Sequence, residues 1–228
     1  MPEVIAQLPC VSRSLRPWAA ALAVLAAAYG RPRRNARGKP LDLFLLALLA
    51  EGHGERAALG WIEKLARRFV DWNEVRVAKP RELRATAPGA PADKLKSIQA
   101  LLQALYEAMG GLDPAPLAAM KPPEVRARLA QMEILSREEI EAVLMIALGV
   151  PTLPGGEGLV RVVRRLGLAP RTATRTQAHK LALKGLAPAA YRDFYDLAGE
   201  HAATRCHANK PDCKHCRTRR LCKSKGKW

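Results

Sequence analysis

Four cysteines stand within the stretch CHANKPDCKHCRTRRLC, residues 206–222: Cys206, Cys213, Cys216 and Cys222. Thiolates this close in sequence must share a metal ion, an iron–sulfur cluster or disulfide bonds. Structural zinc sites usually use two separated C-x2-C pairs, but only Cys213 and Cys216 form such a pair. A [4Fe-4S] cluster takes four thiolates, and uneven spacing lets one loop wrap around it. The spacing favours the cluster over zinc or disulfides, and it does not need His207 or His215 as alternative ligands.

The charge balance points to a polyanionic partner. Among 228 residues, 38 Lys and Arg face 21 Asp and Glu, which gives a formal net charge of +17. This excess goes beyond what solubility requires, so nucleic acid is the first candidate partner. Nine of the basic residues lie between Arg205 and Lys227, against a single acid, Asp212. The cysteine loop is therefore expected to contact phosphates.

A membrane surface is the second candidate, because basic residues flank an apolar run from Trp18 to Tyr29. That run is too short to span a bilayer, and no convincing cleavage site follows it. It is interpreted as a packed Ala/Leu-rich helix. The five cysteines are not distributed along the chain as a disulfide framework would require, which indicates a reducing cytoplasm. Cys10 is assigned no role. We expect a monomer that associates with DNA and not with membranes.

The spacing of the apolar residues predicts an all-α fold, because period-2 alternation is scarce while Ala, Leu, Arg and Glu recur at helical intervals. The stretch LDLFLLALLAEG (41–52) is apolar almost all round and predicts a core helix that ends at Gly52. Two amphipathic stretches, 55–70 and 92–111, predict surface helices around it, the second closed by Gly110.

The spacing C-x6-C-x2-C-x5-C after a helical chain resembles the cluster loop of the endonuclease III superfamily of helix-hairpin-helix DNA glycosylases. PLDLFLLALLAEGHGE (40–55) is similar to the family's first barrel helix, and ALGVPTLPGGEGLVRVVRRLGL (147–168) to the segment after its hairpin. The resemblance implies two α-helical domains. Residues 1–40 and 150–228 would form the [4Fe-4S] cluster domain, and 41–149 a six-helix barrel with a degenerate hairpin. Duplex DNA would lie across the cleft between them.

The sequence departs from the family at the catalytic positions. The hairpin, which in the family carries two glycines and a nucleophilic lysine, aligns with MEILSRE (132–138) and places Glu138 at the lysine. A carboxylate cannot form the imine that an amine forms with an opened sugar. The family's aspartate falls at Gly156, so the adjacent Glu157 is the tentative catalytic acid. Gly52 stands where the family carries a glutamine, and His53 is the possible substitute.

The hairpin also has a purely structural interpretation. Ser136 and Glu139 predict a capping box, followed by a helix with an apolar stripe that ends at Gly149. The N-terminus of this helix could still meet a phosphate, with Arg137 adding charge. In VDWNEVRV (70–77), Trp72 and Arg76 are candidates for contact with a base, although a tryptophan between helices more often belongs to the core.

Two functions follow from the resemblance. One is a divergent glycosylase of base excision repair without the strand-cleaving lyase step, and the alternative is a non-catalytic binder of damaged or abasic duplex DNA. Glu157 in the cleft would favour the enzyme, whereas a solvent-facing Glu157 that caps a helix would favour the binder. The residues expected to contact DNA are Arg137, Lys214, Arg217, Arg219, Arg220 and His53.

Overall fold

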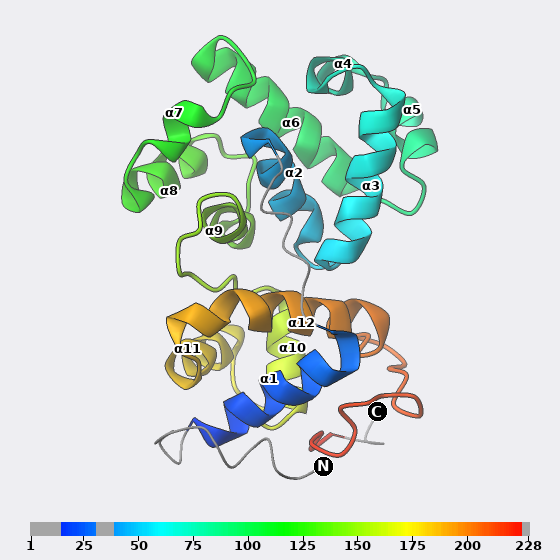
Figure 1. Ribbon diagram of the computed structural model, residues 1–228, viewed down its shortest axis with the longest axis vertical. Helices are drawn as coiled ribbons and strands as arrows, with labels where there is room; N and C mark the ends of the chain where they lie inside the picture. Colours follow the sequence, from blue (N-terminus) through cyan, green and yellow to red (C-terminus); the bar gives the residue numbers. More distant parts are fainter. Residues whose placement is uncertain (1–14, 31–38, 225–228) are drawn as a thin grey trace.

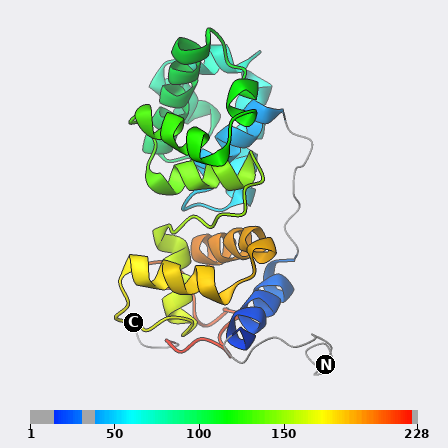
Figure 2. The ribbon, with the colours of Figure 1, turned by 90° about the vertical axis from the view of Figure 1, so that its left-hand side faces the viewer.

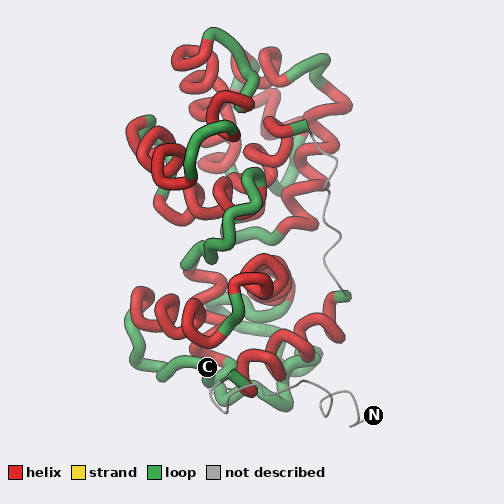
Figure 3. The backbone as a smooth tube through the Cα atoms, turned by 60° about the vertical axis from the view of Figure 1, so that its left-hand side comes forward, coloured by secondary structure: helices red, strands yellow, loops and turns green. Residues whose placement is uncertain are grey.

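The computed structural model describes residues 15–30 and 39–224, and every regular element in these ranges is a helix (Figure 1, Figure 3). The expected all-α fold is confirmed. In chain order the helices are α1 (Arg16–Tyr29), α2 (Pro40–Ala50), α3 (Glu55–Arg68), α4 (Trp72–Val77), α5 (Pro80–Thr86), α6 (Ala92–Met109), α7 (Ala115–Ala118), α8 (Pro122–Gln131), α9 (Arg137–Ile146), α10 (Glu157–Arg165), α11 (Arg175–Gly185), the short 3-10 helix η2 (Pro188–Ala190) and α12 (Tyr191–Thr204).

The helices gather in two groups, one above the other in Figure 1. The upper group holds α2 to α9, and the lower group holds α1, α10, α11 and α12 with the C-terminal loop; Figure 2 shows the same separation from the side. Helix α12 lies along the top of the lower group and contacts α3. One hydrophobic core includes residues of both groups. The division into domains at residues 40 and 150 stays a prediction.

Helix α2 lies at the centre of the upper group because it is apolar on every side. Leu41 and all residues from 44 to 50 are buried, and the helix packs against α3, α6 and α9. This confirms the core helix predicted at 41–52. The helix ends at Ala50, before the predicted Gly52. Glu51 is already extended there, and the Gly54 N–H donates to the Ala50 carbonyl at 2.9 Å.

The two amphipathic helices are confirmed as well. Helix α6 ends at Gly110, whose φ of 69° lies in the left-handed region that favours glycine. Its apolar stripe is buried against the core: Leu95, Ile98, Leu101, Leu102 and Leu105. Helix α3 buries Ala58, Ile62 and Leu65 and turns its charged face to water. Both helices cover α2, as their one-sided apolar patterns require.

The apolar run near the beginning of the sequence is a packed helix, as predicted. Helix α1 buries Trp18, Ala21 and Leu25 and lies against α12. Between residues 15 and 30 and between 39 and 224, no helix is both long enough and apolar enough to cross a bilayer. Cys10 lies outside the described residues.

A glycine allows α1 and α11 to approach each other closely. Gly185 is the last residue of α11, and a Cβ at this position would lie 2.1 Å from Nε1 of Trp18. The Trp18 ring also packs on Phe194 of α12, with 5.8 Å between the ring centroids. The indole is therefore held between two helices and has no room to withdraw.

We predict that Gly185→Ala lowers the free energy of unfolding by about 1–3 kcal/mol, the usual cost of overpacking a core. Urea denaturation followed by tryptophan fluorescence measures it. Gly60→Ala in α3 is the matched control, because no atom lies within 4 Å of its added Cβ. Removing a helical glycine there should leave the protein equally stable or stabilise it by up to about 1 kcal/mol. Equal stability of Gly185→Ala and the unmodified protein would contradict the packing described.

Candidate nucleic-acid interface

The cysteine loop follows α12 directly and folds back onto α10. Cys206 is buried, the other three cysteines are half-buried, and all four thiols are free. The same four cysteines line one cavity together with Arg165, His201 and Thr218. The fold thus brings together the four candidate ligands that the sequence spacing singled out.

Two arginines of α10 hold the beginning of this loop. The buried Arg165 guanidinium donates to the carbonyls of His207 at 2.6 Å, Ala208 at 3.0 Å and Cys206 at 3.3 Å. It also donates to the Cys206 sulfur at 3.3 Å, while Arg161 donates to the Cys206 carbonyl at 2.7 Å. Hydrogen bonds from a charged donor are stronger than neutral ones, so these contacts fix the loop on α10.

The four cysteines lie close enough to affect the pKa of the Cys222 thiol. Burial raises the pKa of the Cys222 thiol, and the charges of Cys206, Cys216 and Cys213 raise it further. Across the described residues, no group of three or more His, Cys, Asp or Glu side chains is arranged to hold a metal ion. A single ion needs its ligands at one point, whereas a cubane places each thiolate on a different iron. The four cysteines are therefore compatible with a cluster.

The loop presents cations to solvent. Its exposed basic residues are Arg205, Lys210, Lys214, Arg217, Arg219, Arg220 and Lys223. Asp212 is engaged within the loop by Arg205 and by His215, whose Nδ1 lies 2.9 Å from Asp212 Oδ1. Arg217 donates to the Ala28 carbonyl of α1 at 3.3 Å, so it also ties the loop to that helix. The resulting surface suits a polyanion.

The hairpin of the upper group is α8, a turn, and α9. The predicted capping box is confirmed: Glu139 N–H donates to Ser136 Oγ at 3.2 Å, and Ser136 N–H donates to Glu139 Oε2 at 2.8 Å. Glu133 in the turn has a φ of 53°, in the left-handed region. Helix α9 ends at Ile146, before the predicted Gly149. Arg137 is exposed at the first position of α9.

Two side chains that the sequence gave no reason to place here neutralise the acids of this hairpin. Lys94 of α6 donates to Glu139 at 2.7 Å, and Arg175 of α11 lies 3.1 Å from Glu138. Burial alone would raise the pKa of Glu139, but the bond from Lys94 lowers it below its usual value. Both acids of the hairpin are thus ion-paired carboxylates.

Glu157 and Gly156 lie at the beginning of α10, where they differ in environment. The Glu157 side chain is 69% exposed and lies 3.7 Å from Arg175. Gly156 is the N-cap of the helix, and a Cβ there would lie 1.9 Å from Oε1 of Glu51. Glu51 accepts a hydrogen bond from the Tyr195 hydroxyl at 2.7 Å. A carboxylate from the upper group therefore fills the space beside Gly156.

The other residues considered for base contact are engaged within the protein. His53 is half-buried, with its ring edge-on to Trp61 at 5.8 Å, and burial lowers the pKa of His53. Trp72 donates to Asp42 at 2.7 Å, and the Arg76 guanidinium covers the Tyr106 ring at 4.2 Å. These contacts support the structural interpretation of Trp72 and Arg76.

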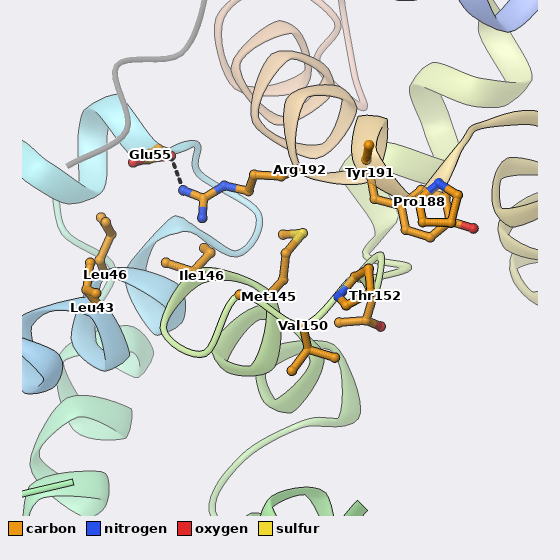
Figure 4. A pocket seen from close by; sticks show the side chains of 13 residues that line it. Leu43, Leu46, Glu55, Met145, Ile146, Val150, Thr152, Pro188, Tyr191 and Arg192 are labelled. Carbon is orange, nitrogen blue, oxygen red and sulfur yellow. Dashed lines mark hydrogen bonds and ion pairs between the residues drawn. The ribbon is translucent and has the colours of Figure 1, made fainter. Parts of the chain in front are cut away.

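A cavity of about 340 Å³ lies between the two groups of helices (Figure 4). Its lining comes from α2, α9, η2 and α12, with Met145 and Thr152 on one side and Pro188 and Tyr191 on the other. At one end, Arg192 of α12 reaches Glu55 of α3 at 2.7 Å, the dashed contact in Figure 4. This ion pair crosses from the lower group to the upper one.

No protein family model matches the sequence, and no curated protein matches it. Solved structures do match the fold. A non-covalent complex of endonuclease III with DNA gives a TM-score of 0.64 at 17% identity, over 94% of this chain and 96% of that one. A thermostable thymine-DNA glycosylase gives 0.63 at 15% identity, over 92% and 96%. A Schizosaccharomyces pombe 3-methyladenine DNA glycosylase in complex with abasic DNA gives 0.61 at 17% identity, over 89% and 98%. The chain has the endonuclease III fold.

The buried ion pair at Arg192 makes stability depend on pH. Arg192 lies between Glu55 at 2.7 Å and Asp196 at 2.8 Å. Burial raises the pKa of Asp196 to about 7; Arg192 opposes this shift and Glu55 adds to it. Since the folded-state pKa exceeds the unfolded value of about 4, the contribution of Asp196 to stability is greatest at low pH and falls as the pH rises towards 7.

We predict that Arg192→Met costs about 3–5 kcal/mol at pH 8, because two buried carboxylates lose their counter-ion. The loss should be smaller at pH 5, because Asp196, whose pKa is about 7, is protonated there and needs no counter-ion. Denaturant titrations at both pH values measure it. Arg56→Met, whose pair with Glu200 is 3.5 Å apart and 75% exposed on the arginine side, should cost less than about 1 kcal/mol. A loss for Arg192→Met that is equal at both pH values would contradict this account.

Proposed function

We propose that this protein binds duplex DNA and removes a damaged or mismatched base, as a DNA glycosylase of base excision repair that lacks the lyase step. The observation that carries the proposal is the endonuclease III fold over 94% of the chain, shared with structures that hold DNA. The formal net charge of +17 supports a polyanionic partner. The exposed cations of the cysteine loop supply a surface for the phosphates.

The loop contributes the main phosphate contacts in this proposal. In the described chain, no side-chain hydrogen bond or ion pair engages Lys214, Arg219 or Arg220, so their charges are available to a ligand. Arg217 has one contact, to the Ala28 carbonyl, and keeps an exposed guanidinium. Arg137 and the N-terminus of α9 add a second point of contact, although Glu138 and Glu139 weaken the attraction for an anion there.

Cys206, Cys213, Cys216 and Cys222 would hold a [4Fe-4S] cluster, whose role is to give the loop a fixed shape. The donor set fits, since four thiols line one cavity and arginine N–H groups point at the loop that carries them. Hydrogen bonds to ligand sulfurs stabilise the charged thiolate form, and Arg165 provides one. The cluster takes no part in the removal of the base.

The lyase step is absent because position 138 carries no amine. The lysine that lies near this hairpin is Lys94, and its ammonium group is bound to the buried Glu139 at 2.7 Å. A nucleophilic amine must be free to reach the sugar, whereas the Lys94 amine is engaged by this contact. Hydrolysis of the N-glycosidic bond by water is therefore the proposed reaction.

The second candidate function is a binder of damaged or abasic DNA that performs no chemistry. The exposure of Glu157 favours it, because this carboxylate faces solvent at the beginning of α10 and pairs with Arg175. Fold and charge support the binder as well as the enzyme. Only measurement of base release separates the two.

Duplexes with uracil, oxidised pyrimidines, mismatched adenine or an abasic site test the proposal. We predict release of at least one base without strand cleavage, and no borohydride cross-link to any duplex, because Glu138 stands where the resemblance places the nucleophilic lysine. A lysine-bearing endonuclease III on the same duplexes is the positive control for trapping.

Tight binding of an abasic duplex with no base release from any substrate would establish the binder instead. A cross-link that maps to Lys94 or to any other residue between the two groups would show that a lyase nucleophile exists.

The cluster has its own test. Protein purified without oxygen should be brown and contain about four iron and four sulfide ions per chain. Cys213→Ala should lose the colour and much of the DNA affinity. His215→Ala, two residues away and paired only with Asp212, should keep both. Stoichiometric zinc without iron would rule out the iron–sulfur assignment.

The loop cations should set the salt dependence of binding. Replacing Lys214, Arg217, Arg219 and Arg220 together by Ala should reduce the slope of log K against log salt by roughly four units, about one per phosphate contact. Fluorescence anisotropy between low and moderate salt measures the slope. The control variant removes the same charge from α3 and α5, which lie far from the loop in Figure 1: Lys64, Arg67, Arg81 and Arg84. Equal slopes for the two variants would remove the loop from the DNA interface.

A further inference from the structure

Gly156 is a glycine because Glu51 takes its side-chain space. Its φ of −63° and ψ of 160° are ordinary extended values that any residue adopts, so the backbone does not require glycine here. A Cβ at this position would lie 1.9 Å from Oε1 of Glu51, 3.0 Å from its carboxyl carbon and 3.5 Å from Oε2. The Glu51 carboxylate thus stands where a short side chain on residue 156 would stand.

The setting of Glu51 is unusual for a carboxylate with only a structural role. It accepts one hydrogen bond, from the Tyr195 hydroxyl at 2.7 Å, and no ion pair reaches it from the described residues. Burial raises the pKa of Glu51; the Tyr195 bond and the charge of Lys94 oppose the shift, and Glu138 and Glu139 add to it. A buried carboxylate without a counter-ion costs stability, and such costs are typical of functional sites.

Glu51 also lines a small cavity whose wall is rich in glycine. Five glycines surround this space: Gly52, Gly54, Gly156, Gly158 and Gly199. The first turn of α10 borders it, and the positive end of a helix dipole favours a negative charge. The dipole therefore favours the charged form of Glu51, against the effect of burial.

We propose that Glu51 is the catalytic carboxylate of base removal, delivered from the end of α2 across the junction to the first turn of α10. This proposal rests on the proposed glycosylase function. Tyr195 is its positioning residue, because its hydroxyl group donates to Glu51 Oε2 at 2.7 Å and fixes the rotamer of that carboxylate.

Other acids at the junction are less suited to the task. Glu157 is 69% exposed, and Glu138 lies 3.1 Å from Arg175. Glu55 and Asp196 share the guanidinium of Arg192. An acid already neutralised by an arginine has little charge left to stabilise a cationic sugar.

The reaction balances with this one acid. The bond between sugar C1′ and the base nitrogen breaks, and its electron pair leaves with the base. The Glu51 carboxylate stabilises the positive charge that develops on the sugar. Water then adds to C1′ and gives its proton to Glu51, which passes it to the departing base. The products are the free base and an abasic sugar, with Glu51 returned to its carboxylate form.

Single-turnover base release from the best duplex of the panel tests the role of Glu51. Glu51→Gln, an isosteric change, should slow release by about 100-fold or more, the usual effect of losing an electrostatic contact to the transition state. Affinity for an abasic duplex and the melting temperature should stay close to those of the unmodified protein. Glu107→Gln, at an exposed carboxylate of α6, is the matched control. Loss of activity in Glu157→Gln but not in Glu51→Gln would overturn the assignment.

Relocating the acid gives a stricter test. Gly156→Asp alone should disturb the site, because its Cβ would lie 1.9 Å from Oε1 of Glu51 and one of the two carboxylates must move. Adding Glu51→Ala removes this clash and returns a carboxylate to the same space from α10. Base release by the double variant should be at least about tenfold faster than base release by Glu51→Ala. A double variant no faster than Glu51→Ala would argue against a direct role for a carboxylate in this space.

A binding measurement tests Glu51 without turnover. Duplexes that carry a cationic pyrrolidine or a neutral tetrahydrofuran in place of the nucleotide differ in the charge of the sugar. The unmodified protein should prefer the cation by about tenfold or more, and Glu51→Gln should lose this preference. Absence of base release with this preference intact would refute the proposed enzyme and keep the carboxylate site. Base release unaffected by Glu51→Gln would refute the site and keep the enzyme.

Discussion

Two buried polar contacts from α12 determine how the upper and lower groups of helices meet. The Tyr195 hydroxyl donates to Glu51 at 2.7 Å, and Arg192 pairs with Glu55 at 2.7 Å. Both acids stand at the turn between α2 and α3. One face of α12 therefore binds this turn of the upper group through two side chains. A buried charge requires its partner at a fixed distance, which apolar packing does not demand. The position of Glu51 beside Gly156 follows from these contacts.

Helix α10 connects this junction with the cysteine loop. Its first turn borders Glu51, and its last residue, Arg165, bonds the carbonyls of residues 206–208. A helix of nine residues is about 13 Å long and stiff on that scale. The candidate catalytic carboxylate and the candidate phosphate surface therefore lie at opposite ends of one rigid element.

Local signals made much of the fold predictable. The all-round apolar pattern of α2, the glycine stop of α6 and the capping box of Ser136 each depend on residues within a few positions of one another. Helices α2 and α9 end before the residues that the sequence predicts, because the tertiary contacts of the turns that follow them determine where they end. Glu51, Lys94 and Arg165 escaped prediction because their partners lie 144, 45 and 42 residues away in sequence.

The exclusion between Glu51 and a side chain at position 156 restricts the evolutionary routes to this sequence. A chain with Asp at 156 and Glu at 51 would bring two acids into one space, and one of the two carboxylates would have to turn away. Glycine at 156 leaves this space to Glu51, so we expect the two positions to vary as a pair among related sequences. A site can in this way keep its carboxylate while the helix that supplies it changes.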